Sequence, residues 1–459
     1  MSFLLASCGN SVKKDDSVSD SSSDTIHADN TQTESIVLTM AMTGDSSGIE
    51  QAIREFNAED NGYRIEIKQY SDQISDEELS YEESSKKYQY EDFGILQDII
   101  NSSEIDIVCN SSFFNESYYE ILQNKGAFVD LYTFMENDGE VNTDTLDTHI
   151  LDLNETDGKL YTLPVFYAIN TLAGDSEYVG QKENWTFDEF VSHWNSMPAG
   201  STIMGSNQKE NVYPIVLRNN LDSFIDYENA MVHFDSPDFK KMLEFCNQFE
   251  SSNGQKGTYD HEAISFINPI LATGIMASPT FNPENGLTCV GYPSQSREGA
   301  YLSSMDLCYS INAKSSSQKQ EGAWMFIRTF VTEEYQMDHV IPFIEGTSNV
   351  EGYYSSEMGF CVNRNAFDKI AEKLINKEYY SSSFEDKDNT YDRRFPTEKD
   401  VTELRRYILS VNQWGTMVDT SLEEIIDDEV FAYFNGEESI DDCVDIIQSR
   451  ASIWISEQS

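Results

Sequence analysis

The sequence predicts an α/β protein of two lobes joined by crossing strands. A chain of 459 residues is too long for one hydrophobic core, so two lobes are expected. Strand-like and helix-like apolar patterns alternate along the chain, which is typical of α/β folds. Two apolar runs that lie far apart, within 157–171 and 307–311, are suited to cross from one lobe to the other.

The N-terminal part of the chain predicts a tether followed by a β-α-β unit. Residues 9–35 are rich in Ser, Asp and Thr and contain few apolar side chains, so we expect no packed core there. A short apolar run at 36–38 predicts a strand, the apolar spacing at 49–56 predicts a helix, and alternation at 64–67 predicts the next strand. This order favours a parallel sheet.

The middle of the chain predicts a further buried strand and the first crossing strand. Residues 105–109 form an apolar run that ends at Asn110, and ligands of open α/β sheets bind at such strand ends. The run 157–171 is interrupted by Pro164, which lacks an N–H donor. Proline is confined to edge strands and strand ends, so we expect this run to leave one lobe near Pro164.

The second half predicts further helices and strands from apolar spacing. Helices are expected near 186–194, 239–249, 262–271, 320–330, 422–434 and 444–454, and strands at 274–279, 290–293 and 307–311. Thr186 and Glu189 have the spacing of a capping box. Four tryptophans fall on helix starts or apolar faces and are expected in the core, namely Trp185, Trp194, Trp324 and Trp454.

The charge of the chain is extreme. It contains 30 Lys and Arg against 81 Asp and Glu, a formal net charge of −51. Such a surface repels phosphate backbones and anionic lipid headgroups, so we expect no nucleic acid as a partner. No apolar run reaches the length of a membrane-spanning helix, so the sequence predicts none.

No motif for enzyme or metal chemistry stands out in the sequence. The seven cysteines include no C-x-x-C pair, and those after Cys8 are expected to be free buried thiols. There is no G-x-S-x-G, no H-E-x-x-H and no Walker loop, and the six histidines are dispersed. On these grounds we expect no cofactor, no resident metal and no catalytic residues.

The N-terminus resembles a bacterial lipoprotein signal. Residues 5–9, Leu-Ala-Ser-Cys-Gly, resemble the lipobox in which the cysteine is lipidated and becomes the first residue of the mature chain. The resemblance implies lipidation at Cys8 and anchoring to the outer face of the cell membrane. Residues 9–35 would then hold the folded part away from the lipid surface.

The order of short segments is similar to that of extracellular solute-binding proteins of ABC importers, the carbohydrate-type family 1. The similar segments are IDIV at 105–108, GAFVDL at 126–131, DGKLYTLP at 157–164, WTFDEF at 185–190, GYP at 291–293, AW to FVT at 323–332, GFCVN at 359–363, YFNG at 433–436 and IQSR at 447–450. Cys361 stands where the family often has proline.

The resemblance implies a type II periplasmic-binding-protein-like fold. We expect residues 1–35 to be signal remnant and tether, 36–168 plus 309–390 to form one lobe, and 169–308 plus 391–459 to form the other. The chain would act as a monomer that captures a sugar or oligosaccharide outside the membrane. It would deliver this ligand to the permease subunits of the importer by closing at its hinge.

Matching the ligand loops of the family by position implies a set of binding residues. They are Gly44, Asp45, Ser46, Asn110, Ser111, Tyr167, Phe281, Tyr292 and Trp414. Aromatic faces, amides and carboxylates suit the apolar faces and hydroxyl edges of sugars. Two alternatives stay open at this point: the same fold with a peptide, polyamine or metal as ligand, and a secreted enzyme acting on glycans.

Overall fold

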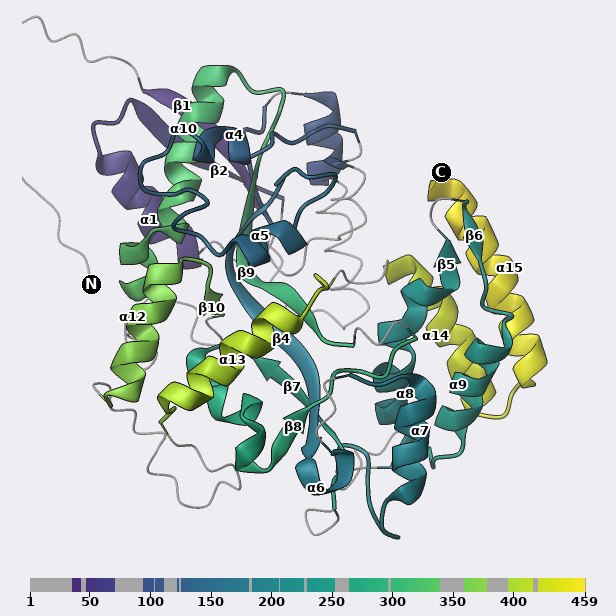
Figure 1. Cartoon of the computed structure of the whole chain (residues 1–459). Coiled ribbons are helices and arrows are strands. Elements are labelled where there is room, and N and C mark those ends of the chain that lie inside the picture. The colour runs from purple at the N-terminus through teal and green to yellow at the C-terminus, as the bar shows by residue number, and fades with distance from the viewer. Residues whose placement is uncertain are drawn as a thin grey trace, which may run out of the picture. The chain divides into compact units, whose positions relative to one another are not determined.

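A computed structural model of the chain gives the arrangement of its helices and strands (Figure 1). It describes residues 35–42, 47–70, 94–102, 104–110, 122–123, 125–180, 184–205, 207–226, 229–251, 264–295, 299–338, 359–377, 395–415 and 420–458. The lipobox with Cys8 and the tether lie outside these residues. Residues Ile36–Ser459 form one compact unit.

One mixed sheet runs through this unit. Its described strands are β1 Ile36–Met42, β2 Tyr63–Gln69, β3 Ile107–Asn110, β4 Leu163–Asp175, β7 Asn268–Ala272, β8 Leu287–Cys289, β9 Tyr301–Ile311 and β10 Phe360–Cys361. The order is β10-β4-β9-β3-β1-β2, and β7 and β8 also pair with β4. β1 is parallel to β2 and β3, whereas the strands that pair with β4 and β9 are antiparallel to them. With helix α1, Ser47–Ala58, the first two strands confirm the predicted β-α-β opening.

Strand β4 is the first crossing strand expected from the sequence, and it extends to Asp175. Pro164 lies near its start and is paired on one side by Cys308 of β9, and a bulge follows it. Because proline cannot donate a ladder hydrogen bond, this position at the beginning of the strand tolerates it. Beyond the bulge, β10 and β7 pair with the second edge of β4.

Helices and strands enclose a first core. The helices are α4 Tyr132–Met135, α5 Thr148–Leu153, α10 Ser317–Ile327, α12 Arg364–Ile375 and α13 Glu398–Ser410, with the 3-10 helices η3 Ile275–Phe281, η4 Pro283–Asn285 and η5 Arg328–Val331 nearby. The first core includes apolar side chains of β1, β4, β9, α10, α12 and α13. A smaller core under β1 and β3 includes Ile95 and Ile99 of the helical residues 94–101.

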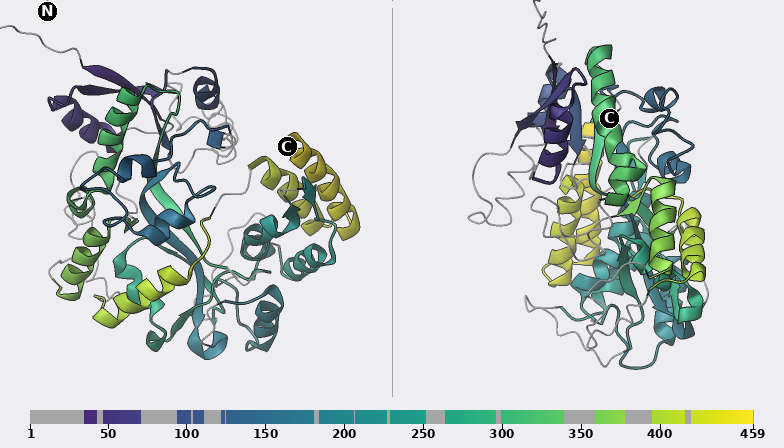
Figure 2. Two further views of the ribbon diagram at one scale, coloured as in Figure 1. Left: turned by 45° about the horizontal axis from the view of Figure 1, so that its top comes forward. Right: turned by 90° about the vertical axis from the view of Figure 1, so that its left-hand side faces the viewer.

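A second core is built by a separate group of helices. These are α6 Ser176–Val179, α7 Phe187–Ser196, α8 Lys209–Val216, α9 Pro237–Asn247, α14 Thr420–Phe434 and α15 Ile440–Gln458, with the 3-10 helix η2 Arg218–Phe224 and the strands β5 Ile225–Asp226 and β6 Met231–Val232. Figure 2 shows α14 and α15 packed side by side. The capping box of Thr186 and Glu189 at the start of α7 is formed as predicted.

Three of the local predictions in the second half are wrong. Residues 262–271 were expected to be helical, but Asn268–Ala272 form strand β7 against β4. Residues 274–279 were expected as a strand and instead belong to η3, and the strand expected at 290–293 ends earlier, at Cys289 of β8. Short apolar runs fit a strand and a buried helical turn equally well, and their neighbours decide between them.

The two cores group residues differently from the predicted lobe boundaries. Val401 and Tyr407 of α13, expected in the second lobe, belong to the first core, as does Ile275 of η3. The second core contains Trp185 and residues of α14 and α15. Other predictions about the cores hold: Trp185, Trp324 and Trp454 are buried, Trp194 packs against the second core, and the six cysteines after Cys8 are free and buried.

None of the described helices combines the length and the apolar character that a membrane crossing requires.

Candidate functional site

The two crossing strands, β4 and β9, have one face turned towards the first core and the opposite face turned away from it. In the ladder, Ile169 pairs with Leu302 and Tyr167 with Ser304, while Asn170 pairs with Tyr301. Side chains alternate between faces along a strand, and directly paired residues share a face. Ile169 and Leu302 are fully buried in the first core, so Tyr301 and Asn170 project from the opposite face.

This opposite face carries an aromatic pair. The rings of Tyr292 and Tyr301 are stacked with centroids 6.0 Å apart and planes inclined by 27°. Both side chains are half-buried, and burial raises the pKa of each phenol above its ordinary value. Both phenols are therefore neutral at physiological pH and can donate and accept hydrogen bonds. An aromatic surface with hydroxyl groups at its edge suits a ligand with apolar faces and polar rims.

The loop that carries Tyr292 is held by the second core. The buried indole Nε1 of Trp185 donates to the carbonyl oxygen of Gly291 at 2.9 Å. The amide of Asn220 donates to the carbonyl oxygen of Pro293 at 2.6 Å. The N–H of Tyr292 donates to the carbonyl oxygen of Gly299, and a Cβ at Gly299 would lie 1.8 Å from the carbonyl oxygen of Tyr292. Glycine is therefore required where the two backbones meet.

Tyr301 rests on a third chain segment, which leads from α13 towards α14. The N–H of Leu302 donates to the carbonyl oxygen of Gln413 at 2.9 Å, and the N–H of Gly415 donates to the carbonyl oxygen of Leu302 at 2.6 Å. A Cβ on Gly415 would lie 2.1 Å from Cδ2 of Tyr301. The absence of a side chain at Gly415 is thus what lets the tyrosine ring lie against the backbone.

Polar groups complete this face of the ladder. The side-chain amide of Asn170 donates to Oγ of Ser303 at 3.0 Å, and both residues are half-buried. With the tyrosine pair they form the candidate site: Tyr292, Tyr301, Asn170 and Ser303. An amide, a hydroxyl and two phenols can match several hydroxyl groups of one ligand.

The structure places Tyr167 and Phe281, both predicted as ligand residues, in the first core. Tyr167 is 1% exposed on the core face of β4 and packs against Phe360 at a ring-centroid distance of 5.4 Å. Phe281 is 3% exposed and packs against Tyr407, with ring centroids 5.0 Å apart. Both rings therefore pack in the first core in this structure and offer no surface to a ligand.

Trp414 lies next to the aromatic pair but faces the other way. It forms a bridge with Leu302 and packs against the first core, whereas Gly415 faces Tyr301. Of the predicted aromatic residues, Tyr292 alone lies on the candidate face within the described chain.

The predicted loop residues Gly44, Asp45, Ser46 and Ser111 lie outside the described residues, and so does the side chain of Asn110. The strands that lead to these loops are neighbours, because Met42 at the end of β1 pairs with Cys109 near the end of β3. Both loops therefore start from the same edge of the sheet. Their role in binding stays a prediction.

The sequence analysis missed Tyr301, Asn170 and Ser303. Each lies at an alternate position of a crossing strand, next to residues that are fully buried. Because side chains alternate between the two faces of a strand, known strand limits would have placed Tyr301 and Ser303 on one face. Tyr301 was missed because the second crossing strand was expected only from residue 307 onwards.

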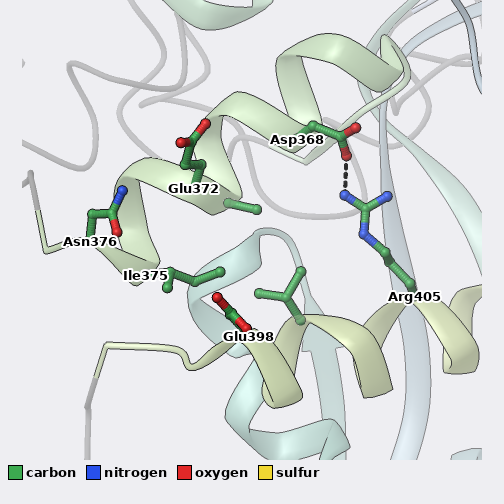
Figure 3. A pocket seen from close by; sticks show the side chains of 8 residues that line it. Asp368, Glu372, Ile375, Asn376, Glu398 and Arg405 are labelled. Atoms are coloured by element: carbon green, nitrogen blue, oxygen red, sulfur yellow. Dashed lines mark hydrogen bonds and ion pairs between the residues drawn. The ribbon is translucent and has the colours of Figure 1, made fainter.

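A cavity of about 330 Å³ lies elsewhere, between α12 and α13 (Figure 3). Its lining includes Asp368, Glu372, Glu398 and Arg405, and an ion pair joins Arg405 to Asp368. It is distinct from the face that carries the tyrosine pair. Within the described ranges no cluster of His, Cys, Asp and Glu side chains could hold a metal ion.

Comparison with known proteins shows the fold. No protein-family profile matches the chain, and no curated protein matches it. Solved structures do match. The sugar-binding protein MalE from the phytopathogen Xanthomonas citri is 10% identical, with a TM-score of 0.51 over 92% of this chain and 98% of its own. Extracellular solute-binding protein family 1 from Alicyclobacillus acidocaldarius is 12% identical, with a TM-score of 0.50 over the same shares.

At these identities the likeness establishes the architecture. The protein has the α/β fold of periplasmic-binding-protein-like solute-binding proteins, as the sequence predicts.

Proposed function

We propose that the protein is the substrate-binding component of an ABC importer. It captures a sugar or oligosaccharide outside the membrane and delivers the ligand to the permease by hinge closure. The observation that carries this proposal is the stacked Tyr292–Tyr301 pair beside Asn170 and Ser303, where the loop before β9 meets the crossing strands of a solute-binding fold.

The chemistry of this face favours a sugar over the other ligands considered. Its described side chains are uncharged phenol, amide and hydroxyl groups. A polyamine or a peptide terminus would need a countercharge, and a ferric ion would need several oxygen ligands around one point. A saccharide needs aromatic faces and neutral hydrogen-bonding groups, which this face supplies.

The proposed role includes no chemical reaction on the ligand. A ligand that binds on the crossing strands would affect how the elements on the two sides of these strands are placed relative to each other. We propose that Cys8 carries a lipid that anchors the protein at the outer face of the membrane, and that the permease recognises the closed form. Loss of metabolic palmitate labelling in Cys8→Ser would support the anchor, and equal labelling would refute it.

A thermal-shift screen followed by calorimetry tests the ligand class. A saccharide present at a thousand times its dissociation constant should stabilise the protein by about 4 kcal/mol. Stabilisation by polyamines, peptides or ferric ion and by no saccharide would refute the sugar assignment. Turnover of a glycan by the purified protein would refute a pure binding role.

Substitution tests the site itself. Tyr301→Ala and Tyr292→Ala should each weaken saccharide binding by about tenfold or more, because each removes one aromatic contact and disturbs the other ring. Tyr178→Ala, at a half-buried tyrosine of α6, is the matched control and should bind as the natural protein does. Equal affinity in all three variants would remove the tyrosine pair from the site.

A further inference from the structure

A single histidine holds the end of α13 at two points. Nε2 of His149, in α5, lies 3.1 Å from the carbonyl oxygen of Ile408 and 3.0 Å from that of Val411. Both partners are carbonyl oxygens and can only accept hydrogen bonds, so Nε2 must carry the proton. The histidine therefore satisfies carbonyl groups at the point where α13 ends and the next segment begins.

The histidine is itself fixed by the first core. Its neighbours Ile150 and Leu151 are fully buried, and the carboxylate of Asp147 accepts a hydrogen bond from the backbone N–H of His149 at 3.1 Å. The N–H of Asp147 donates to the carbonyl oxygen of Val362 at 2.9 Å. The imidazole thus projects from a short helix that is fixed in two ways: its apolar side chains pack in the core, and its first turn is hydrogen-bonded to the segment that leads to α12.

The segment that His149 holds leads directly to the aromatic pair. Val411 is followed by Gln413, which accepts a hydrogen bond from Leu302, and by Gly415, which donates one to Leu302. Gly415 lies against the ring of Tyr301. A displacement at Val411 would therefore reach the tyrosine ring within four residues.

We propose that His149 is a positioning residue for the ligand site. It does not contact the tyrosine pair; it fixes the end of α13, and the segment from Gln413 to Gly415 then sets the position of the Tyr301 ring. This inference rests on the proposed function for its consequence in binding. The placement of the ring by His149 can be measured without any ligand.

A fluorine probe at position 301 tests the placement. The protein is prepared with 3-fluorotyrosine in place of Tyr301, which gives one ¹⁹F resonance. His149→Leu keeps much of the side-chain volume and removes the donor, so the resonance should shift or broaden. His149→Gln retains an N–H donor and should restore it, and His233→Ala, at an exposed histidine, should leave it unchanged. If His149→Leu lowers the melting temperature but leaves the ¹⁹F resonance as it is in the protein with His149, then His149 has only a structural role. That result would overturn the proposal.

A measurement on the unsubstituted protein covers the case in which His149→Leu fails to fold. The ¹⁵N shifts of His149 should report a proton on Nε2, and a proton on Nδ1 alone would overturn the proposal, because the two carbonyl contacts could not then form. Calorimetry with maltotriose forms the second arm. If the natural protein binds this sugar, His149→Leu should weaken binding by about two- to tenfold, the range of one aromatic contact. If the natural protein binds no saccharide in the thermal-shift screen, the proposed function fails, while the fluorine result still decides the role of His149.

Discussion

Substitution of Gly415 by alanine tests the geometry of the candidate site most directly. An added Cβ would lie 2.1 Å from Cδ2 and 2.6 Å from Cε2 of Tyr301, where ordinary contacts begin at 3.4 Å. The ring or the backbone must therefore move by more than 1 Å. The backbone is restrained by two hydrogen bonds to Leu302, so we expect the tyrosine ring to yield.

The cost follows from what the ring would lose. Tyr301 stacks on Tyr292 at 6.0 Å, and such a pair contributes about 0.5–1.5 kcal/mol beyond the area it buries. Forcing an extra methyl group into a packed position costs about 1–3 kcal/mol. We therefore expect Gly415→Ala to lower the free energy of unfolding by about 1–3 kcal/mol and to weaken saccharide binding about tenfold.

The assay compares two glycine-to-alanine variants by denaturant unfolding and calorimetry. Gly139 is exposed, and a Cβ there would have no neighbour within 4 Å, so Gly139→Ala introduces the same backbone change without a steric clash. If Gly415→Ala matched Gly139→Ala in both stability and affinity, the ring of Tyr301 would be loosely held. The role of the Tyr292–Tyr301 pair as a ligand-binding surface would then be refuted.

Three further predictions concern the supports of the fold. Burial raises the pKa of Asp138, but hydrogen bonds from the N–H groups of residues 141 and 140, from Trp324 and from Arg328 outweigh it and hold the pKa below its ordinary 3.8. The contribution of Asp138 to the free energy of unfolding is thus present above pH 3.8 and is lost as the pH falls through the lowered pKa. Asp138→Asn should therefore reduce the loss of stability measured between neutral and acidic pH. A loss equal to that of the natural protein would contradict the assignment. Lys209→Met should lower the free energy of unfolding by about 1–3 kcal/mol, because the buried ammonium donates to Asn247 and to the carbonyl oxygen of Phe434. The control Lys241→Met, at an exposed lysine, should change it little. Equal losses in the two variants would argue against a stabilising role of the Lys209 hydrogen bonds. Tyr407→Phe and Thr171→Val each remove one partner of a buried 2.6 Å hydrogen bond, so the double variant should lose less stability than the sum of the two, and strict additivity would exclude the coupling.

The sequence predicts the regular elements with strong periodicity well. The helix after Thr186 carries its start in its own residues, because the capping box and the apolar face are local features. The β-α-β opening is confirmed for the same reason. The crossing strand around Pro164 could also be expected, since a proline near the start of a strand removes a donor that this edge does not need.

The candidate site could be predicted only in part, because burial depends on distant residues. Tyr167 and Phe281 were expected at the ligand site by their position relative to the family, but Phe360 and Tyr407 pack against them from elements much later in the chain. Tyr301 gains its position from Gly415, which no local pattern connects with it. A pairing between such distant positions is fixed by tertiary packing and not by local propensity.

Strand β4 has a consequence for how the chain folds. Ile169 and Ala173 face the first core while Leu172 belongs to the second, so both cores share this one strand. Its partner β9 follows more than a hundred residues later, with the helices α7, α8 and α9 of the second core between them. A ribosome must therefore release the chain beyond Ile311 before the β4–β9 ladder can close, and the ladder has to wait for a contact of long sequence separation. We expect slow folding with late formation of the ladder, and an N-terminal fragment that ends before β9 should remain unfolded for lack of its partner strand.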